Sequence, residues 1–278
     1  MIKIKTAVFP VAGMGTRFLP ATKANPKEML PIVDKPLIQY AVEEAVSAGM
    51  TQMVFITGRT KNSISDHFDK AYELESELEK KGKTELLKLV QGIVPKNVTC
   101  IYIRQAEPLG LGHAVLCAAP VVGDNAFAVI LADDLINNQN NTCMQQLVKI
   151  YEQFEHSVLA VEEVPKQNTQ NYGVIKPNLT TKLPKNLYQL DGIVEKPKPE
   201  DAPSNLSVVG RYILTPKIFE LLNETQKGAG GEIQLTDAIE HLLQHETVNA
   251  CQFEGRRFDC GSKLGYLEAT VEYALQHP

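Results

Sequence analysis

No run of apolar residues in this sequence approaches the roughly 18 that a transmembrane helix needs. The first residues also contain no charged segment followed by a long apolar run and a small-residue cleavage site. These two absences argue against a membrane span and against a secretory leader. We therefore expect a cytoplasmic chain with no membrane partner.

Cysteine is scarce and follows no recognisable pattern. The five cysteines are an odd number, they are widely spaced, and none of them forms a CxxC pair. They are Cys100, Cys117, Cys143, Cys251 and Cys260. This pattern predicts ordinary thiols.

Positive charge is also limited, because the net charge is −5 and no basic block occurs anywhere in the chain. The electrostatic footprint of a nucleic-acid-binding protein is therefore absent. At 278 residues, with 44% hydrophobic and 22% charged content, the chain has the composition of an ordinary globular protein. Any local cluster of cations is expected to bind a small ligand.

The first half of the chain alternates strand-like and helix-like segments. The stretch "IKIKTAVFP" predicts a buried first strand, and "KPLIQYAVEEAVSAG" has apolar residues at helical spacing. Strands are also predicted at "MVFIT", "VTCIYI" and "AFAVIL", with a helix at "GHAVLCAAP". Residues 72–91 predict one long amphipathic helix, with an apolar stripe of Leu74, Leu78, Leu86, Leu87 and Val90. This rhythm predicts a largely parallel sheet covered by helices on both faces.

The pattern changes at Ser157, after which short strand-like runs follow one another without intervening helices. They are "SVLAVEEV", "YGVIKP", "YQLDGIVEKP" and "SVVGRYIL", and they predict an antiparallel addition to the α/β core. Helical patterns return from residue 216 to the end. Because no clear linker is present, we expect a single domain over 1–278, with approximate parts 1–156, 157–215 and 216–278.

The segment "VAGMGTRFLPATKANPKEMLP" is a loop between the first strand and the first helix. Gly13 and Gly15 would let backbone N–H groups approach an anion, and Arg17, Lys23 and Lys27 would add positive charge. The loop matches neither the GxxxxGK[ST] nor the GxGxxG motif, so a glycine-rich turn with solvated cations is the alternative. The combination of glycines, cations and "PKEMLP" favours a phosphate cradle.

A pair of carboxylates ends the apolar run "VILADDL". In open α/β sheets, functional groups lie at the carboxyl ends of strands. Magnesium commonly takes one or two carboxylates together with substrate phosphates. Asp133 and Asp134 therefore form a candidate metal site, in which an acid that does not bind the metal would tune the site or cap the next element; a simple acidic turn is the alternative.

These motifs resemble those of the sugar-1-phosphate nucleotidyltransferases. The resemblance begins with "AGMGTRFLPATKANPKEMLPIVDKPLIQY" and extends over nearly the whole chain through "KNSI", "GLGHAVLCA", "YGV", "VEKP", "APSNL", "VGRY", "GEIQLTDAI" and "DCGSKLGY". It implies a Rossmann-like nucleotidyltransferase fold with a largely parallel mixed sheet, flanked by helices, and an added antiparallel sugar-binding region. It also implies a magnesium-assisted, in-line attack of a sugar 1-phosphate on the α-phosphorus of a nucleoside triphosphate.

The resemblance implies roles for single residues. Arg17 would contact the β- and γ-phosphates and Lys27 the α-phosphate, while Asp133 and Asp259 would hold Mg²⁺. Lys196 would reach the sugar phosphate. The expected nucleotide-binding residues are Ala12, Gly13, Gly15, Glu28, Gln105 and Gly110, and the expected sugar-binding residues are Tyr172, Gly173, Glu195 and Lys196. Without the resemblance, Lys23 is equally a solvated loop charge and His113 a surface residue at a helix start.

The same motifs also distinguish between branches of this family. "KEMLP", "GLGHAVLCA" and "EIQLTDAI" favour the uridylyl branch, with UTP and glucose 1-phosphate as substrates, over thymidylyl, adenylyl or guanylyl relatives. A regulatory paralogue without activity is disfavoured, because every expected catalytic residue is present. Analogy with relatives further implies a homodimer or homotetramer.

Overall fold

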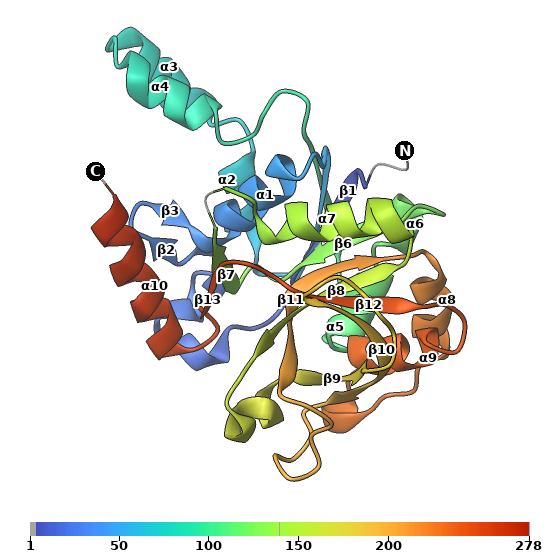
Figure 1. Cartoon of the computed structure of the whole chain (residues 1–278). Helices are drawn as coiled ribbons and strands as arrows, with labels where there is room; N and C mark the ends of the chain where they lie inside the picture. Colours follow the sequence, from blue (N-terminus) through green and yellow to red (C-terminus); the bar gives the residue numbers. More distant parts are fainter. Residues whose placement is uncertain (1–3, 139, 278) are drawn as a thin grey trace.

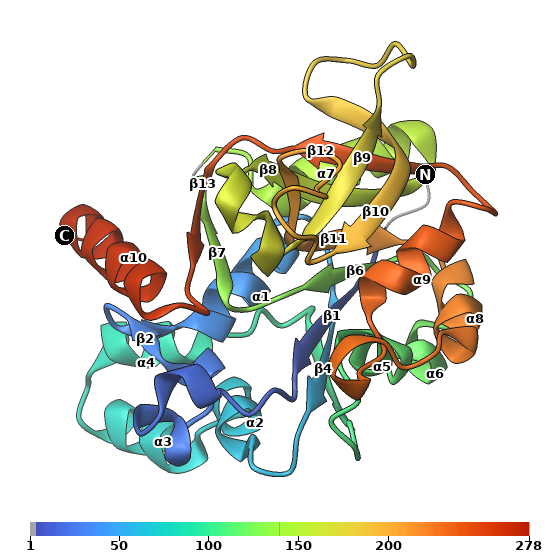
Figure 2. The same cartoon turned by 90° about the horizontal axis from the view of Figure 1, so that it is seen from below.

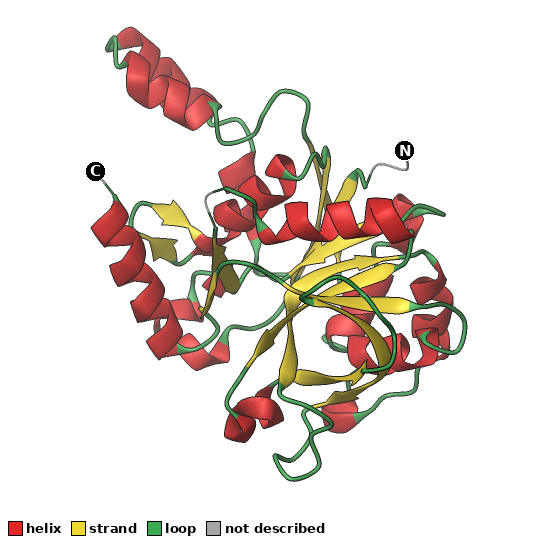
Figure 3. Cartoon of the chain, in the orientation of Figure 1, coloured by secondary structure: helices red, strands yellow, loops and turns green. Residues whose placement is uncertain are grey.

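The structure is a computed structural model that describes residues 4–138 and 140–277 (Figure 1). Within these residues, one mixed sheet of nine strands has the order β5-β4-β1-β6-β11-β8-β12-β10-β9. Figure 3 draws the strands in yellow and the helices around them in red. Its strands are β1 (Thr6–Val11), β4 (Gln52–Thr57), β5 (Thr99–Arg104), β6 (Phe127–Ile130), β8 (Ser157–Glu163), β9 (Gly173–Asn178), β10 (Leu187–Glu195), β11 (Leu206–Leu214) and β12 (Val248–Gln252). Two short ribbons accompany it, formed by β2 (Pro31–Ile32) with β3 (Lys35–Pro36) and by β7 (Asp134–Asn137) with β13 (Arg256–Asp259). The predicted fold class, an α/β sheet with an antiparallel addition, is confirmed.

Helices cover both faces of the sheet (Figure 2). One face carries α5 (Leu111–Leu116), α6 (Ala119–Val122), α8 (Lys217–Glu224) and α9 (Leu235–Leu242). The opposite face carries α1 (Leu37–Ser47), α2 (Asn62–Phe68) and α7 (Cys143–Phe154). Successive strand residues alternate between these two cores. Val8 packs on the first face and Phe9 on the second, where its ring stacks on Phe55 at 5.0 Å.

The four strands β5, β4, β1 and β6 are parallel, so their carboxyl ends lie along one edge of the sheet. The chain runs from β1 outward through β4 to β5 and then returns to place β6 on the other side of β1. In open α/β sheets, ligands bind beside such a reversal of strand order. The predicted phosphate loop follows β1, and Asp133 lies in the turn after β6.

The second half of the chain extends the same sheet. Strand β11 pairs antiparallel with both β6 and β8, and β10 pairs antiparallel with β9 and β12. Strand β12, which the sequence patterns did not predict, pairs parallel with β8. Helix α7 was also not predicted, although Thr142 and Gln145 form a capping box at its start.

The single long helix predicted over residues 72–91 is wrong. The structure has two helices, α3 (Tyr72–Lys80) and α4 (Thr84–Gln91), joined at Gly82, whose φ of +65° ends the first helix. Together they form a hairpin that projects from the body (Figure 1). Leu78 is buried, but Leu74 and Leu86 of the predicted stripe are about half exposed.

The C-terminal helix α10 (Lys263–Gln276) packs on β13 and β2 and forms a third, small core around Phe258 and Ala269. Four apolar side chains on its outer side are exposed, namely Leu264, Leu267, Val271 and Leu275. No helix in the described part of the chain is long and apolar enough to cross a membrane. All five cysteines are free thiols, as predicted.

Candidate active site

A cavity of about 560 Å³ lies beside the carboxyl end of β6. Its walls come from the loop after β1, the β6–β7 turn, the start of β9, the end of β10 and the start of α10. The predicted site residues that line it are Arg17, Asp133, Tyr172, Gly173, Glu195, Lys196 and Asp259. The fold thus gathers predicted phosphate-, metal- and sugar-binding residues, which are far apart in the sequence, around one space.

The loop after β1 holds Arg17 at the edge of this cavity. Gly15 adopts φ +66°, and its carbonyl accepts a hydrogen bond of 2.6 Å from the Thr22 hydroxyl, which folds the loop back on itself. Arg17 is exposed, and its Nη1 donates a long hydrogen bond of 3.5 Å to the Gly261 carbonyl. Among the residues that the structure describes, no carboxylate forms an ion pair with Arg17. Its guanidinium can therefore accept an anionic partner.

Lys27 lies against the predicted metal ligand. Its Nζ is 2.5 Å from Oδ2 of Asp133, and each side chain is 25% exposed. Burial disfavours the charged form of Asp133, but the Lys27 ammonium outweighs it and lowers the pKa of this carboxyl. The pKa of Lys27 is correspondingly raised, because Asp133 and Glu28 overcome the effect of burial. Asp133 is therefore ionised over the whole neutral range.

Asp133 and Asp259 face a common point. A Cβ placed on Gly261 would lie 2.9 Å from Oδ1 of Asp259 and 3.1 Å from Oδ2 of Asp133, so these oxygens are at most about 6 Å apart. Nη1 of Arg17 lies 3.3 Å from the same point. Burial, followed by repulsion from Asp134, raises the pKa of Asp259. In the described part of the chain no cluster of three or more His, Cys, Asp or Glu could hold a metal. Two convergent carboxylates nevertheless fit magnesium, which takes its remaining ligands from phosphates and water.

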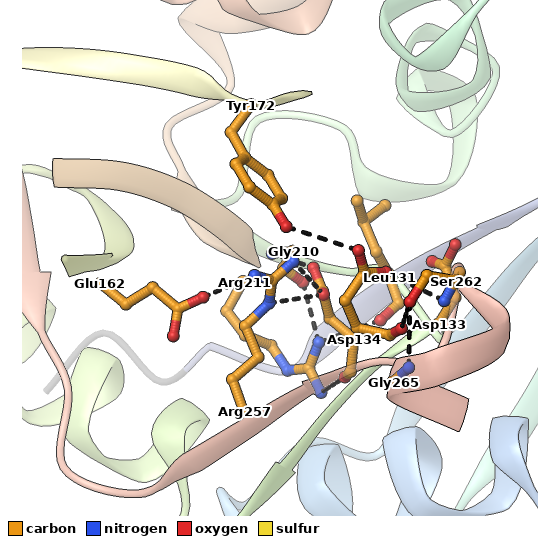
Figure 4. A network of polar contacts seen from close by, with 12 residues as sticks. Leu131, Asp133, Asp134, Glu162, Tyr172, Gly210, Arg211, Arg257, Ser262 and Gly265 are labelled. Carbon is orange, nitrogen blue, oxygen red and sulfur yellow. Dashed lines mark hydrogen bonds and ion pairs between the residues drawn. The ribbon is translucent and has the colours of Figure 1, made fainter. Parts of the chain in front are cut away.

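Asp134 is fully engaged by the protein. Its Oδ1 accepts from Nε of Arg257 at 2.7 Å and lies 2.6 Å from Nη2, while its Oδ2 accepts from the Gly210 N–H at 2.8 Å (Figure 4). It is the first residue of β7, so it stands at the start of the next element. Its carboxylate therefore has a structural role and is not directed at the point shared by Asp133 and Asp259.

Arg211 is a supporting residue that the sequence analysis missed. It is 1% exposed and pairs with Glu44 at 2.8 Å. It also donates to the carbonyls of Leu131 at 3.0 Å and Asp134 at 2.7 Å, on the two sides of Asp133. An arginine within the apolar run of "SVVGRYIL" was the available signal, because a buried arginine needs partners.

The predicted base-contacting residues lie just beyond the carboxyl ends of β1 and β5, two parallel strands that have β4 between them. Ala12 follows β1 and Gln105 follows β5. The Gln105 amide donates to the Gly110 carbonyl at 3.1 Å and lies 3.0 Å from Nδ1 of His113. Gly110 has φ +94°, and an added Cβ would clash with Glu232 at 2.6 Å. His113 lies at the start of α5, as expected, but it is partly buried and contacts Gln105.

Glu28 does not line the cavity wall. Its side chain is 2% exposed and pairs with Lys61, which is 5% exposed, at 2.8 Å. Burial raises the pKa of Glu28, and Lys61 and Lys27 oppose that rise. The pair joins the turn that carries Lys27 to the start of α2. Lys61 was missed, although it begins the "KNSI" segment.

The predicted sugar-binding residues meet at the end of β10. Lys196 adopts φ +45°, which turns the chain so that its Nζ lies 3.0 Å from Oε1 of Glu195. Oε2 of Glu195 accepts a hydrogen bond from Thr236, and an added Cβ on Gly173 would lie 3.1 Å from Cγ2 of Thr236. Tyr172 directs its hydroxyl toward Asp259 at 3.4 Å. Side chains of adjacent residues in an extended strand point to opposite sides. The turn at Lys196 instead lets Glu195 and Lys196 border the same cavity.

Comparison with known proteins agrees with this geometry. Residues 7–276 match the model of the nucleotidyl transferase family. A UTP–glucose-1-phosphate uridylyltransferase of Pseudomonas aeruginosa is 52% identical over 268 residues, which are 96% of this chain and 95% of that protein.

Solved structures extend the similarity to three dimensions. A UTP-bound UGPase from Acinetobacter baumannii has a TM-score of 0.92 and 47% identity, with coverage of 99% of this chain and 95% of that one. A UDP-glucose pyrophosphorylase in complex with UDP-glucose has a TM-score of 0.89 and 46% identity, with coverage of 99% and 100%. The chain therefore belongs to the nucleotidyl transferase family, in the branch of the UTP–glucose-1-phosphate uridylyltransferases.

Proposed function

We propose that this enzyme transfers a uridylyl group from UTP to α-D-glucose 1-phosphate, giving UDP-glucose and pyrophosphate. The relatives named above carry this activity in their names, and two of the similar structures hold UTP and UDP-glucose. The observation that carries the proposal is the cavity in which Arg17, Asp133 and Asp259 face Glu195 and Lys196.

The reaction requires two polyanions to approach each other. A phosphate oxygen of glucose 1-phosphate forms a bond to the α-phosphorus of UTP, while the bond from that phosphorus to the oxygen of the β-phosphate breaks and pyrophosphate leaves. The enzyme has to offset the repulsion and hold the attacking and leaving oxygens in line. The cations around the cavity offset the repulsion between the two polyanions. The strand ends that border the cavity hold the two reactants in line.

Arg17 and Lys27 divide this task in the proposal. Arg17 is exposed and unpaired by carboxylates among the described residues, so it is assigned to the β- and γ-phosphates of the leaving group. Lys27, whose Nζ lies 2.5 Å from Asp133, is assigned to the α-phosphate, because Asp133 is the acid expected to lie next to that phosphate. Lys196, with 56% of its side chain exposed, is assigned to the phosphate of the sugar.

Asp133 and Asp259 are proposed to hold Mg²⁺, because their oxygens face one point next to Arg17. When bound there, the ion would offset charge on the phosphoryl oxygens in the transition state. Arg211 and Gly261 support this site, the first by fixing the carbonyls around Asp133 and the second by leaving the shared point open.

Recognition of the two substrates is assigned to opposite ends of the site. Gln105 and the backbone of Gly110 would contact uracil, together with Ala12, Gly13, Gly15 and Glu28 around the nucleotide. Glu195 would accept hydrogen bonds from hexose hydroxyls, and Tyr172 and Gly173 would border the ring. We further propose that the chain acts as one domain and assembles as a homodimer or homotetramer.

A single plate of assays tests the proposal. Pyrophosphate release is measured with UTP, dTTP, ATP and GTP, each with glucose 1-phosphate and magnesium, and again with galactose 1-phosphate. We expect the highest kcat/KM for UTP with glucose 1-phosphate. A higher value for dTTP, ATP or GTP would assign the chain to another branch, and no release with any pair would refute an enzymatic role.

A further inference from the structure

Arg257 lies at the junction of the predicted metal and sugar sites, and no step of the proposed reaction uses it. It is on β13, two residues before Asp259, and residues two apart on a strand face the same side. Its side chain is 6% exposed and borders the cavity. The neighbouring Arg256 faces the opposite side, is 61% exposed and pairs with Glu272.

The guanidinium of Arg257 is held by two carboxylates from different strands. Nε and Nη2 lie 2.7 and 2.6 Å from Oδ1 of Asp134 on β7, and Nη1 lies 2.5 Å from Oε1 of Glu162 on β8 (Figure 4). One positive charge between two negative ones has little attraction left for a phosphate. Arg257 is therefore unsuited to bind a substrate anion and is well suited to hold a fixed position.

The aromatic ring of Tyr172 rests on this fixed guanidinium. The distance from Cζ of Arg257 to the ring centroid is 4.9 Å, which is a cation–π contact. The hydroxyl of the same ring donates to Oδ2 of Asp259 at 3.4 Å. The other oxygen, Oδ1, accepts from the Gly261 N–H at 3.0 Å and faces the point shared with Asp133. Tyr172 therefore connects the sugar side of the cavity to one of the two proposed metal ligands.

We propose that Arg257 is a positioning residue that sets the ring of Tyr172 for the hexose and, through the Tyr172 hydroxyl, sets the carboxylate of Asp259 for the metal. This inference rests on the proposed function. It predicts that hexose binding and the magnesium requirement are coupled through one side chain, so a change at Arg257 alters both.

Three variants test the coupling. Arg257→Lys keeps the positive charge but removes the planar guanidinium, which lies against the ring of Tyr172 and bonds to two carboxylates at once. Tyr172→Phe keeps the ring and removes only the hydroxyl. Arg256→Lys is the matched control, because it makes the same change one residue away on the exposed side of the same strand. Unfolding midpoints show that each variant is folded.

Two quantities are measured. The first is the dissociation constant of UDP-glucose in the presence of a chelator, by calorimetry, which needs neither metal nor turnover. The second is the magnesium concentration that gives half-maximal turnover. Arg257→Lys should raise both by about three- to tenfold, the range for one lost polar contact. Tyr172→Phe should raise mainly the magnesium requirement, by a similar factor, and Arg256→Lys should change neither.

The double variant distinguishes coupling from general damage. Once Arg257→Lys has released the ring, adding Tyr172→Phe should raise the magnesium requirement little further. The inference would be overturned if the two substitutions raised the magnesium requirement independently, so that their factors multiplied. It would also be overturned if Arg257→Lys changed neither the dissociation constant of UDP-glucose nor the magnesium requirement. If Arg257→Lys does not fold, an unchanged magnesium requirement in Tyr172→Phe overturns it. A wild-type chain inactive with every nucleotide would instead refute the proposed function and this inference with it.

Discussion

At the scale of single residues, the two proposed metal ligands differ in their electrostatic surroundings. Asp133 lies 2.5 Å from a lysine ammonium, and its pKa is lowered despite burial. Asp259 lies near Asp134 and Asp133, and its pKa is raised by burial and by those charges. One carboxylate is therefore stabilised in its charged form by the protein, and the other is not.

Replacing Asp133 tests its proposed role directly. Asp133→Asn keeps the shape of the side chain and removes the charge, so turnover should fall by orders of magnitude while the fold survives. Initial rates at several magnesium concentrations and a circular dichroism spectrum measure the two effects. Near-normal turnover at saturating magnesium would exclude Asp133 as a ligand.

Replacing Asp259 should separate stability from activity. Because its folded-state pKa is raised, the folded chain binds this proton more tightly than the unfolded chain does. The contribution of this proton to the free energy of unfolding is fully present below the ordinary aspartate pKa. It is lost as the pH rises through the pKa that Asp259 has in the folded chain. At pH 7, Asp259→Asn should therefore raise the unfolding midpoint, by about 2–4 °C for each kcal/mol gained, and abolish most turnover.

The pH dependence of that gain provides the check. Thermal unfolding of wild type and Asp259→Asn is followed at pH 7 and at pH 3.5. The difference between the two midpoints should shrink toward zero at the lower pH, where the wild-type carboxyl is protonated. A midpoint that drops at pH 7 would contradict the sign of the pKa shift.

Arg17 provides a prediction about geometry as well as charge. If its guanidinium grips the leaving pyrophosphate through two parallel N–H groups, Arg17→Ala should slow both directions of the reaction. Arg17→Lys should restore little of the lost turnover, because an ammonium cannot present two parallel N–H donors to a phosphate. Lys23→Arg is a suitable control on the same loop. Full rescue by lysine in forward and reverse assays would rule out a bidentate contact.

At the scale of elements, the ribbon of β7 and β13 assembles the acidic part of the site. Its register places Asp134 opposite Asp259, so residues 125 apart in the chain are neighbours. Arg257 of the ribbon pairs with Glu162 on β8, and Arg211 on β11 donates to the carbonyl of Asp134, so both arginines fasten the ribbon to the main sheet. Glu44 on α1 holds Arg211 in place. The geometry of the proposed metal site thus depends on the contacts by which Arg211 and Arg257 hold the ribbon.

Asp134→Asn should therefore act mainly on stability. Removing one partner of a buried ion pair leaves the other charge poorly compensated, at a cost of about 3–5 kcal/mol. Urea titration should show this loss, whereas Asp191→Asn, at an exposed aspartate on β10, should show almost none. Turnover per folded molecule should fall less than in Asp133→Asn. Unchanged stability would exclude a fastening role for Asp134.

At the scale of the whole molecule, one sheet joins the two proposed binding regions. The loops after β1 and β5 carry the proposed nucleotide-binding residues, and Asp133 follows β6. The proposed sugar-binding residues lie at the start of β9 and the end of β10. The cavity lies where these regions meet, beside β6 and β11. A continuous sheet can hold two reactants in a fixed relative orientation without a hinge.

Removal of metal should affect activity and leave the fold intact. Lys27 already compensates Asp133, so the folded chain does not need a bound cation to offset that buried charge. A chelator should lower turnover by orders of magnitude, and magnesium should restore it. The unfolding midpoint should move by less than about 2 °C. Chelator-resistant turnover would contradict the proposed metal dependence, and a large drop in the midpoint would assign the metal a structural role.

Local patterns in the sequence were sufficient for much of this description. The alternation of strands and helices, the loop of glycines and cations after β1, and the acids after β6 follow from neighbouring residues, whose spacing is fixed by the covalent chain. The same patterns were misleading where a single residue changes the local structure. Gly82, which can adopt a positive φ, divides one predicted helix into two.

The pairings across the site were decided only by the tertiary structure. The approach of Asp133 to Asp259, the contact of Lys27 with Asp133, and the position of Tyr172 over Arg257 all join distant segments. Such contacts depend on strand order and register, which periodicity does not encode. The sequence by itself therefore determined which chemical groups are available, and the tertiary structure determined which of them meet, because strand pairing brings together residues that the covalent chain keeps far apart.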